Sequence, residues 1–268
     1  MTLNDIAKKL SAAGIENADG EALILAETFS GKSKEELLLE RDAEIGTEKL
    51  EAAIARRISR EPLQHIIGKW YFWREEYKVS PDCLIPRADS EIIVDFATKN
   101  LPHGARFLDL CTGSGCLAIS ILASRPDLSA TALDISERAL ELARYNAKHN
   151  GVSDRIGFIR ADVMKDELPD MGKFDAIVSN PPYIRTSEID MLAPELSFEP
   201  RIALDGGADG LDFYKRILAD FKKYLLPGGM FIFEIGHDEA EAIKALGGAD
   251  TKLFRDYSKN YRMAVIKA

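Results

Sequence analysis

The 268-residue chain contains few cysteines and histidines and has no long hydrophobic run. Its three cysteines, Cys83, Cys111 and Cys116, lack Cys-x-x-Cys spacing, which argues against a disulfide framework or a zinc knuckle. The four histidines are scattered, so no metal site is predicted. No stretch approaches the ~18 consecutive apolar residues of a membrane helix. Residues 1–5 include no basic segment followed by an apolar one, so no secretory signal is expected. These absences predict a reduced, metal-free, cytoplasmic protein without membrane contact.

The charge of the chain is acidic. There are 35 Lys and Arg residues against 44 Asp and Glu residues, a formal net charge of −9. Because a basic face supplies most of the affinity for duplex nucleic acid, this balance argues against stable nucleic-acid binding. Hydrophobic residues at 46% and charged residues at 29% exclude disorder, collagen and coiled coil, and the length favours one large or two smaller domains.

Residues 1–60 carry only helical patterns. Ser33 and Glu36 have capping-box spacing, and Thr47 is placed to begin a further helix. One apolar stripe at helical spacing consists of Leu3, Ile6 and Leu10. The segment is therefore interpreted as a small all-helical domain.

Residues 61–86 have a different residue pattern, with aromatic and β-branched runs at Trp70–Trp73 and Tyr77–Val79. A polar Arg74–Glu76 segment separates the runs, which predicts a β-hairpin with the two tryptophans in its core. We interpret 61–86 as a hairpin linker between two domains.

From residue 87 onward, strand and helix patterns alternate, which predicts a parallel, doubly wound sheet. A helix is expected over 136–150, capped by Ser136 and ended by Gly151. The expected strands are Arg106–Leu110, Ala130–Leu133, Ile156–Ile159, Phe174–Ser179, Met230–Ile235 and Arg262–Ile266.

The residues that follow the first three strands suggest a nucleoside pocket, since ligands of such sheets bind beyond the carboxyl ends of the strands. The first strand leads into a glycine turn, 109–115, which also fits a dinucleotide fingerprint and is weak evidence alone. Asp134 follows the second strand, where a carboxylate can bind ribose hydroxyls or can simply sit at a helix N-terminus. Asp162 and Val163 follow the third, where they could bond and flank an adenine.

The fourth strand ends in Asn180-Pro181-Pro182-Tyr183. Proline holds the residue before it extended. The Asn180 side-chain oxygen and the Pro181 carbonyl can then accept both hydrogens of a planar NH₂ group, and Tyr183 can lie against its face. The group that fits is a carboxamide or the exocyclic amine of adenine or cytosine.

Such a nitrogen is a poor nucleophile because its lone pair is delocalised. Binding both hydrogens as the nitrogen pyramidalises frees the lone pair, and alignment with an activated methyl can supply ~7–11 kcal/mol of the barrier. This suits S-adenosylmethionine, whose sulfonium needs no acid to release its thioether, and it requires no histidine.

With these motifs, the chain resembles the HemK/PrmC family, the protein-(glutamine-N5) methyltransferases that act on peptide chain release factors. One departure is Cys111, where many family members carry glycine. The segments that carry the resemblance are Glu61–Gly68, Ile85–Glu91, Asp109–Gly115, Asp134, Ser179–Ile184, Glu199-Pro200, Asp209–Leu211 and Glu234–Gly236.

The resemblance implies an α/β fold, with a doubly wound, seven-stranded, Rossmann-like methyltransferase domain at 87–268 behind the helical domain and the hairpin linker. S-adenosylmethionine is the implied cofactor. Its expected contacts are Cys111, Thr112, Gly113, Ser114, Gly115, Asp134, Asp162, Val163 and Asn180. The substrate glutamine would be held by Asn180, Pro181, Pro182 and Tyr183, of which Asn180, Pro181 and Tyr183 would act in catalysis.

The implied reaction is methylation of the glutamine in a Gly-Gly-Gln loop of a release factor, with residues 1–60 docking that substrate to a monomeric enzyme. The alternatives are a ribosomal-protein glutamine, a DNA adenine, or a cofactor-occupied adaptor without catalysis. His65, Arg87 and Glu91 either shape the cleft or serve linker packing and ion pairing.

Overall fold

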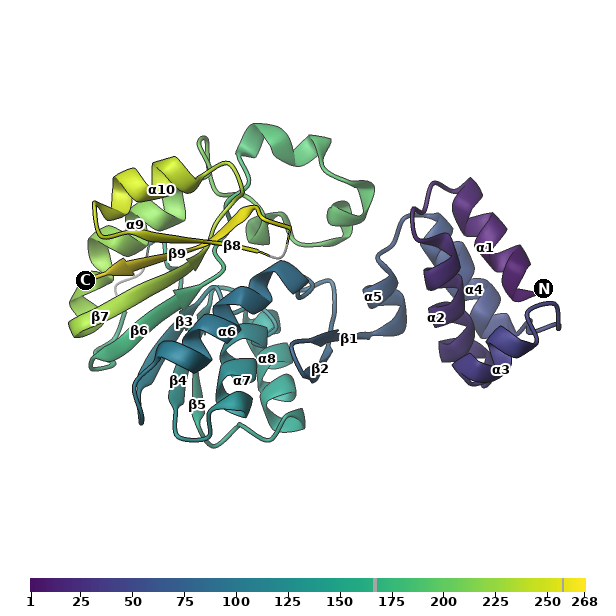
Figure 1. Ribbon diagram of the computed structural model, residues 1–268, viewed down its shortest axis with the longest axis horizontal. Coiled ribbons are helices and arrows are strands. Elements are labelled where there is room, and N and C mark those ends of the chain that lie inside the picture. The colour runs from purple at the N-terminus through teal and green to yellow at the C-terminus, as the bar shows by residue number, and fades with distance from the viewer. Residues whose placement is uncertain (166–167, 257) are drawn as a thin grey trace. The chain divides into compact units, whose positions relative to one another are not determined.

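A computed structural model describes residues 1–165, 168–256 and 258–268 (Figure 1). The chain divides into two compact units. The first consists of residues 1–69 together with 193–198, and the second of residues 70–192 together with 199–268. The sequence pattern did not predict that 193–198 would pack with the helical unit, because its partners lie more than a hundred residues earlier in the chain.

The first unit is helical, as expected. The capping box of Ser33 and Glu36 is present, and the Thr47 side chain accepts a hydrogen bond from the amide of Leu50. Part of the predicted linker is also helical here, because Pro62 opens a short helix. The helices are α1 (Leu3–Ala12), α2 (Ala18–Ser30), α3 (Lys34–Leu39), α4 (Glu48–Ile58) and α5 (Leu63–Ile67).

Segment 193–198 contains the short 3-10 helix Pro194–Phe198, and ion pairs hold it in the first unit. The Glu195 carboxylate lies 3.0 Å from Arg57 Nη2 and 2.8 Å from Arg60 Nη2. Arg57 is only 5% exposed and also pairs with Glu21. A buried guanidinium with two carboxylate partners keeps its hydrogen bonds without water.

The predicted hairpin is present, formed by β1 (Lys69–Phe72) and β2 (Glu75–Lys78). Its buried aromatic residues are Phe72 and Tyr77, whereas Trp70 and Trp73 are half-buried. The Trp73 indole donates a hydrogen bond to Ser124 Oγ at 3.1 Å. The tryptophans therefore lie at the margin of the core rather than at its centre.

The second unit contains the expected seven-stranded sheet, in the order β5-β4-β3-β6-β7-β9-β8. All six strands expected from the sequence are present, whereas Lys252–Arg255 was missed because four residues carry too little pattern. The strands are β3 (Arg106–Leu110), β4 (Ser129–Asp134), β5 (Ile156–Arg160), β6 (Phe174–Ser179), β7 (Leu225–Glu234), β8 (Lys252–Arg255) and β9 (Tyr261–Lys267).

The prediction of a wholly parallel sheet is wrong. β9 runs antiparallel to both β7 and β8. Only residues 256–260 separate β8 from β9, and a parallel crossover needs a dozen or more residues. The short connection therefore forces the last strand to run in the opposite direction.

Helices cover both faces of the sheet (Figure 1). Neighbouring strand residues face opposite ways, so Phe107 packs into one core and Leu108 into the other. One core includes α6 (Glu91–Asn100), α7 (Cys116–Ser124) and α8 (Glu137–His149), and the other α9 (Asp212–Asp220) and α10 (Ala240–Gly247). The helix expected over 136–150 is α8, capped by Ser136.

The remaining elements of the second unit are 3-10 helices at Ala88–Ser90, Thr186–Met191, Arg201–Ala203 and Lys222–Tyr224. None of the helices in the described ranges combines the length and apolar character needed to cross a bilayer.

Candidate active site

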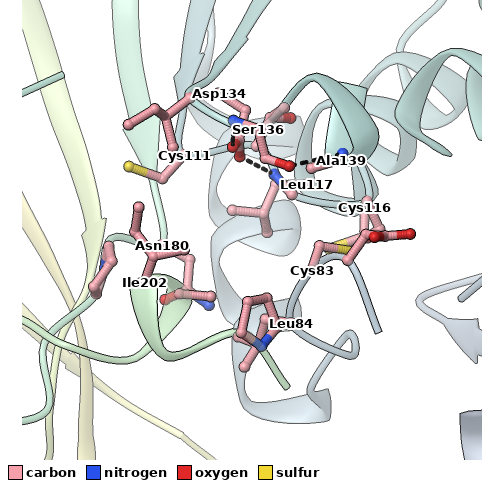
Figure 2. A pocket seen from close by; sticks show the side chains of 18 of the residues that line it. Cys83, Leu84, Cys111, Cys116, Leu117, Asp134, Ser136, Ala139, Asn180 and Ile202 are labelled. Carbon is pink, nitrogen blue, oxygen red and sulfur yellow. Dashed lines mark hydrogen bonds between the residues drawn. The ribbon is translucent and has the colours of Figure 1, made fainter. Parts of the chain in front are cut away.

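The second unit holds a pocket beyond the carboxyl ends of β3, β4 and β6, with about 940 Å³ of empty space including its open mouth. This is where the order of a doubly wound sheet switches direction, since β4 and β6 flank β3 on opposite sides. Figure 2 shows part of its lining. The predicted site residues that line it are Cys111, Thr112, Gly113, Ser114, Asp134, Asp162, Val163, Asn180 and Pro182. Gly115, Pro181 and Tyr183 lie outside this lining.

The turn after β3 forms the pocket's first wall and depends on left-handed backbone. Gly113 and Gly115 have φ values of 54° and 82°. A Cβ on Gly115 would lie 2.8 Å from Ile119 Cδ1, so a larger residue here would also have to displace that side chain. Cys111 is left-handed too, with φ 58°. This explains why glycine suits that position and why cysteine there stores strain.

Asp109 supports this turn from beneath. It is fully buried at the end of β3, and its Oδ2 accepts a hydrogen bond from Thr112 Oγ1 at 2.6 Å. Burial raises the pKa of Asp109 to about 7. The buried carboxyl therefore anchors the turn.

Asp134 closes the turn at the end of β4. Its Oδ2 accepts the amide of Gly113 and its Oδ1 the amide of Ser136, each at 2.9 Å. Burial raises the pKa of Asp134, while these amide bonds act against the rise. Each carboxylate oxygen can accept a second hydrogen bond. Asp134 can thus hold the turn and the start of α8 and still bind two hydroxyls of a ligand.

Asp162 and Val163 follow β5 and line the same pocket. Asp162 Oδ1 accepts the amide of Met164 at 2.9 Å, which shapes this turn. Val163 is 4% exposed, and its carbonyl accepts a hydrogen bond from Arg216 Nε. The pair gives the pocket one acidic and one apolar side chain next to Asp134.

Asn180 stands at the end of β6 and faces this pocket (Figure 2). The preceding Ser179 Oγ donates to the carbonyl of Leu110 at 2.7 Å, which ties β6 to the start of the glycine turn. The Asn180 Nδ2 atom donates to Ser90 Oγ at 3.3 Å. The opposite end of the amide, Oδ1, is then the end available to a ligand.

Pro181, Pro182 and Tyr183 form the rigid base of this corner. Both prolines are buried. The Tyr183 hydroxyl donates to Glu234 Oε1 at 3.2 Å, and burial together with the Glu234 charge raises the pKa of Tyr183. A Cβ on Gly206 would lie 2.6 Å from Tyr183 Cα, so glycine is needed where the 204–210 loop crosses the corner. Contact between Tyr183 and a substrate stays a prediction.

Residues of two further segments, 82–90 and 200–203, also line the pocket, and of these only Arg87 was considered for the cleft from the sequence. Glu199 joins them, since its Oε2 accepts the amide of Ile85 at 2.9 Å and its Oε1 pairs with Arg87. Arg87 therefore both lines the pocket and makes an ion pair. The only sequence signal for this wall was the family resemblance at 85–91 and 199–200.

The other two residues considered for the cleft lie elsewhere. Glu91 accepts the amide of Trp73 at 2.8 Å and supports the hairpin. His65 is buried in the helical unit. Neither belongs to the pocket lining. Among the described residues, no group of three or more His, Cys, Asp or Glu side chains is arranged to hold a metal ion.

Comparison with known proteins gives matches in both units. Residues 88–199 match the family model for the methyltransferase small domain, and residues 2–68 match that for the PrmC N-terminal domain. A methyltransferase crystal structure from Pyrococcus furiosus is similar in fold, with a TM-score of 0.53, 19% identity, and coverage of 82% of this chain and 98% of that one.

Curated relatives are similar over most of their length. A release factor glutamine methyltransferase of Caulobacter vibrioides is 36% identical, covering 96% of this chain and 92% of its own. One from Geobacter sulfurreducens is 40% identical, covering 87% of this chain and 82% of its own.

Proposed function

Because the chain belongs to the release factor glutamine methyltransferase family, we propose that it methylates the side-chain amide nitrogen of the glutamine in the Gly-Gly-Gln motif of peptide chain release factors. The methyltransferase domain and these relatives imply S-adenosylmethionine as the methyl donor. The observation that carries the proposal is the shared pocket of Asn180, the glycine turn and Asp134.

The residues of the pocket fit the cofactor. Asp134 offers carboxylate oxygens suited to ribose hydroxyls, and the turn at 111–115 allows close approach of backbone because three of its residues are left-handed. Asp162 and Val163 suit the edge and face of an adenine. When bound, S-adenosylmethionine supplies a methyl carbon attached to a positively charged sulfur.

The amide end of the pocket suits a primary carboxamide. Asn180 Oδ1 would accept one N–H of the glutamine, and the Pro181 carbonyl would accept the other. These two acceptors hold the nitrogen and favour its pyramidal form, in which the lone pair is free. Once the nitrogen is methylated, the Pro181 carbonyl accepts the proton that becomes acidic. Orientation then supplies most of the rate enhancement.

We assign the remaining roles by domain. Residues 1–60 would dock the release factor, 61–86 would serve as linker, and 87–268 would carry the chemistry. We further propose that the protein acts as a monomer, that it does not bind nucleic acid stably, and that it works in the cytoplasm, where its translation substrate is found.

The direct test is incubation of the purified chain with S-adenosylmethionine and a release factor, followed by mass spectrometry of the tryptic peptides. One added methyl group on the Gly-Gly-Gln glutamine is the expected product. A Gln→Asn release factor at that position is the matched control and should remain unmethylated. If ribosomal protein is methylated and the release factor is not, the enzyme has the alternative substrate instead.

A further inference from the structure

The Asn180 amide has two ends of similar size, and only one of them suits the substrate. Its carbonyl oxygen can accept a hydrogen bond from a glutamine NH₂ group. Its own NH₂ group cannot, because both groups would then be donors. Rotating the amide by half a turn changes its shape little. A hydrogen bond must therefore decide which end faces the pocket.

That hydrogen bond comes from Ser90, which lies at the start of α6 and is 2% exposed. Its Oγ accepts from Asn180 Nδ2 at 3.3 Å and donates its own hydrogen to Glu234 Oε2. A hydroxyl has one hydrogen. Because Ser90 gives that hydrogen to Glu234, it can only accept from Asn180.

Glu234, at the end of β7, determines which partner donates in these hydrogen bonds. It is 2% exposed, and both of its carboxylate oxygens accept hydrogen bonds from hydroxyls, Oε2 from Ser90 and Oε1 from Tyr183. An ionised carboxylate is an acceptor only, so neither hydroxyl can turn around. The same carboxylate therefore orients residues at both ends of the Asn180–Tyr183 corner.

The groups around Glu234 act on its ionisation in both directions. Burial raises the pKa of Glu234, while the Arg262 guanidinium acts in the opposite direction. Arg262 also pairs with Asp89, the neighbour of Ser90, at 3.2 Å. Tyr214 donates to the main-chain carbonyl of Glu234 at 2.7 Å and holds the strand end in place.

We propose that Glu234 is a positioning residue which, acting through Ser90, makes Asn180 present its carbonyl oxygen to the substrate amide. This rests on the proposed function, because it concerns the same amide-binding corner. Glu234 itself touches no substrate. Its contribution is the direction of a hydrogen-bond chain that runs from the end of β7 through Ser90, just before α6, to Asn180, just after β6.

The first experiment is a double-mutant cycle on the full chain. Glu234→Gln replaces one acceptor oxygen with an NH₂ group, which lets the Ser90 hydroxyl turn toward Asn180 Oδ1 and reverse the amide. We expect kcat to fall on the order of 10²-fold, with the affinity for S-adenosylmethionine unchanged. In a Ser90→Ala background the same substitution should lower kcat by about twofold or less, because the hydrogen-bond connection from Glu234 to Asn180 is already lost.

Glu239→Gln is the matched control, since the Glu239 carboxylate is also buried and accepts from Gly236 and Tyr214, but it makes no hydrogen bond to Ser90 or Tyr183. It should leave kcat within about twofold. An equal loss from Glu234→Gln with and without Ser90 would overturn the proposal. If Glu234→Gln does not fold, the Ser90→Ala variant alone tests the proposal, and full activity in that variant would overturn the proposal as well.

The second experiment does not depend on turnover. In protein labelled with ¹⁵N-asparagine, the side-chain NH₂ resonances of Asn180 should shift in Ser90→Ala and in Glu234→Gln, and stay in place in Glu239→Gln. Unchanged Asn180 resonances in Glu234→Gln would refute the positioning role. If the wild type leaves the release factor unmethylated, the proposed function fails, and this readout still tests the inference.

Discussion

The two halves of the pocket are each built over a buried carboxyl group at a strand end, but they are connected differently. The glycine-turn half (residues 109–115 and 134–136) rests on Asp109, whose partner Thr112 is three residues away. The Asn180 half (Ser90, Asn180–Tyr183 and Glu234) rests on Glu234, whose partners Ser90 and Tyr183 are 144 and 51 residues away. The glycine-turn half thus joins two segments 21 residues apart, and the Asn180 half joins three segments that are distant in sequence.

The difference shows which interactions can be damaged separately. Backbone amides and left-handed residues form the glycine-turn half, so its shape depends on local conformation. Side-chain hydroxyls and an amide form the Asn180 half, so its function depends on the direction of hydrogen bonds. Variants of one half should leave the other intact.

Asn180→Ala should have the largest effect. It removes an acceptor of the substrate amide, so we expect methyl transfer to fall about 10³-fold. The affinity for S-adenosylmethionine, measured by titration calorimetry, should change by about threefold or less, because the glycine turn is untouched. A loss of cofactor affinity as large as the loss of rate would show that the halves are not separable.

Asp109→Asn should change the pH dependence of stability. The pKa of Asp109 is raised from 3.8 to about 7 in the folded protein, so its ionisation destabilises the fold as pH rises between those values. Between pH 5 and 8 the wild type should lose about 2–3 kcal/mol of unfolding free energy relative to the variant. Denaturant unfolding at both pH values measures this, and parallel profiles would contradict it.

Asp134→Asn should weaken cofactor binding while leaving the Asn180 half in place. The new NH₂ group can donate but not accept, so a ribose hydroxyl loses a charged acceptor, which costs about 2 kcal/mol of binding, or ~30-fold in Kd. Turnover at saturating cofactor should stay close to wild type. Asp127→Asn is the control, because Asp127 also accepts a backbone amide, that of Gly104, but lies outside the pocket lining. Equal Kd changes in the two variants would be evidence against a ribose site.

Cys111→Gly should have the smallest effect and a stabilising direction. Glycine adopts φ near 58° without strain but loses more backbone entropy on folding, so the expected gain is at most about 1 kcal/mol. Cys111→Val should destabilise instead. Thermal unfolding compares the three proteins, and a lower Tm for the glycine variant would mean that the thiol makes a contact worth more than the strain.

Sequence reasoning was most successful where neighbouring residues determine the structure. The capping box at Ser33, the helix capped by Ser136 and six of the seven main strands follow from local patterns, and each is present. The packing of 193–198 with the helical unit was not predicted because it depends on which distant segments meet in space. Strand β8 was missed because it is too short to carry a pattern, and the direction of β9 follows from the short connection between β8 and β9.

The candidate site divides in the same way. A left-handed turn, an acid at the next strand end and an Asn-Pro-Pro-Tyr corner can be recognised in the sequence because each is a few consecutive residues with unusual backbone requirements. The wall formed by 82–90 and 200–203 was indicated only by the family resemblance, and the chain of hydrogen bonds from Glu234 through Ser90 to Asn180 could not be recognised. A hydrogen bond between residues 144 positions apart exists only once α6 and β7 are packed on the same sheet, so tertiary structure alone decided how the amide is aimed.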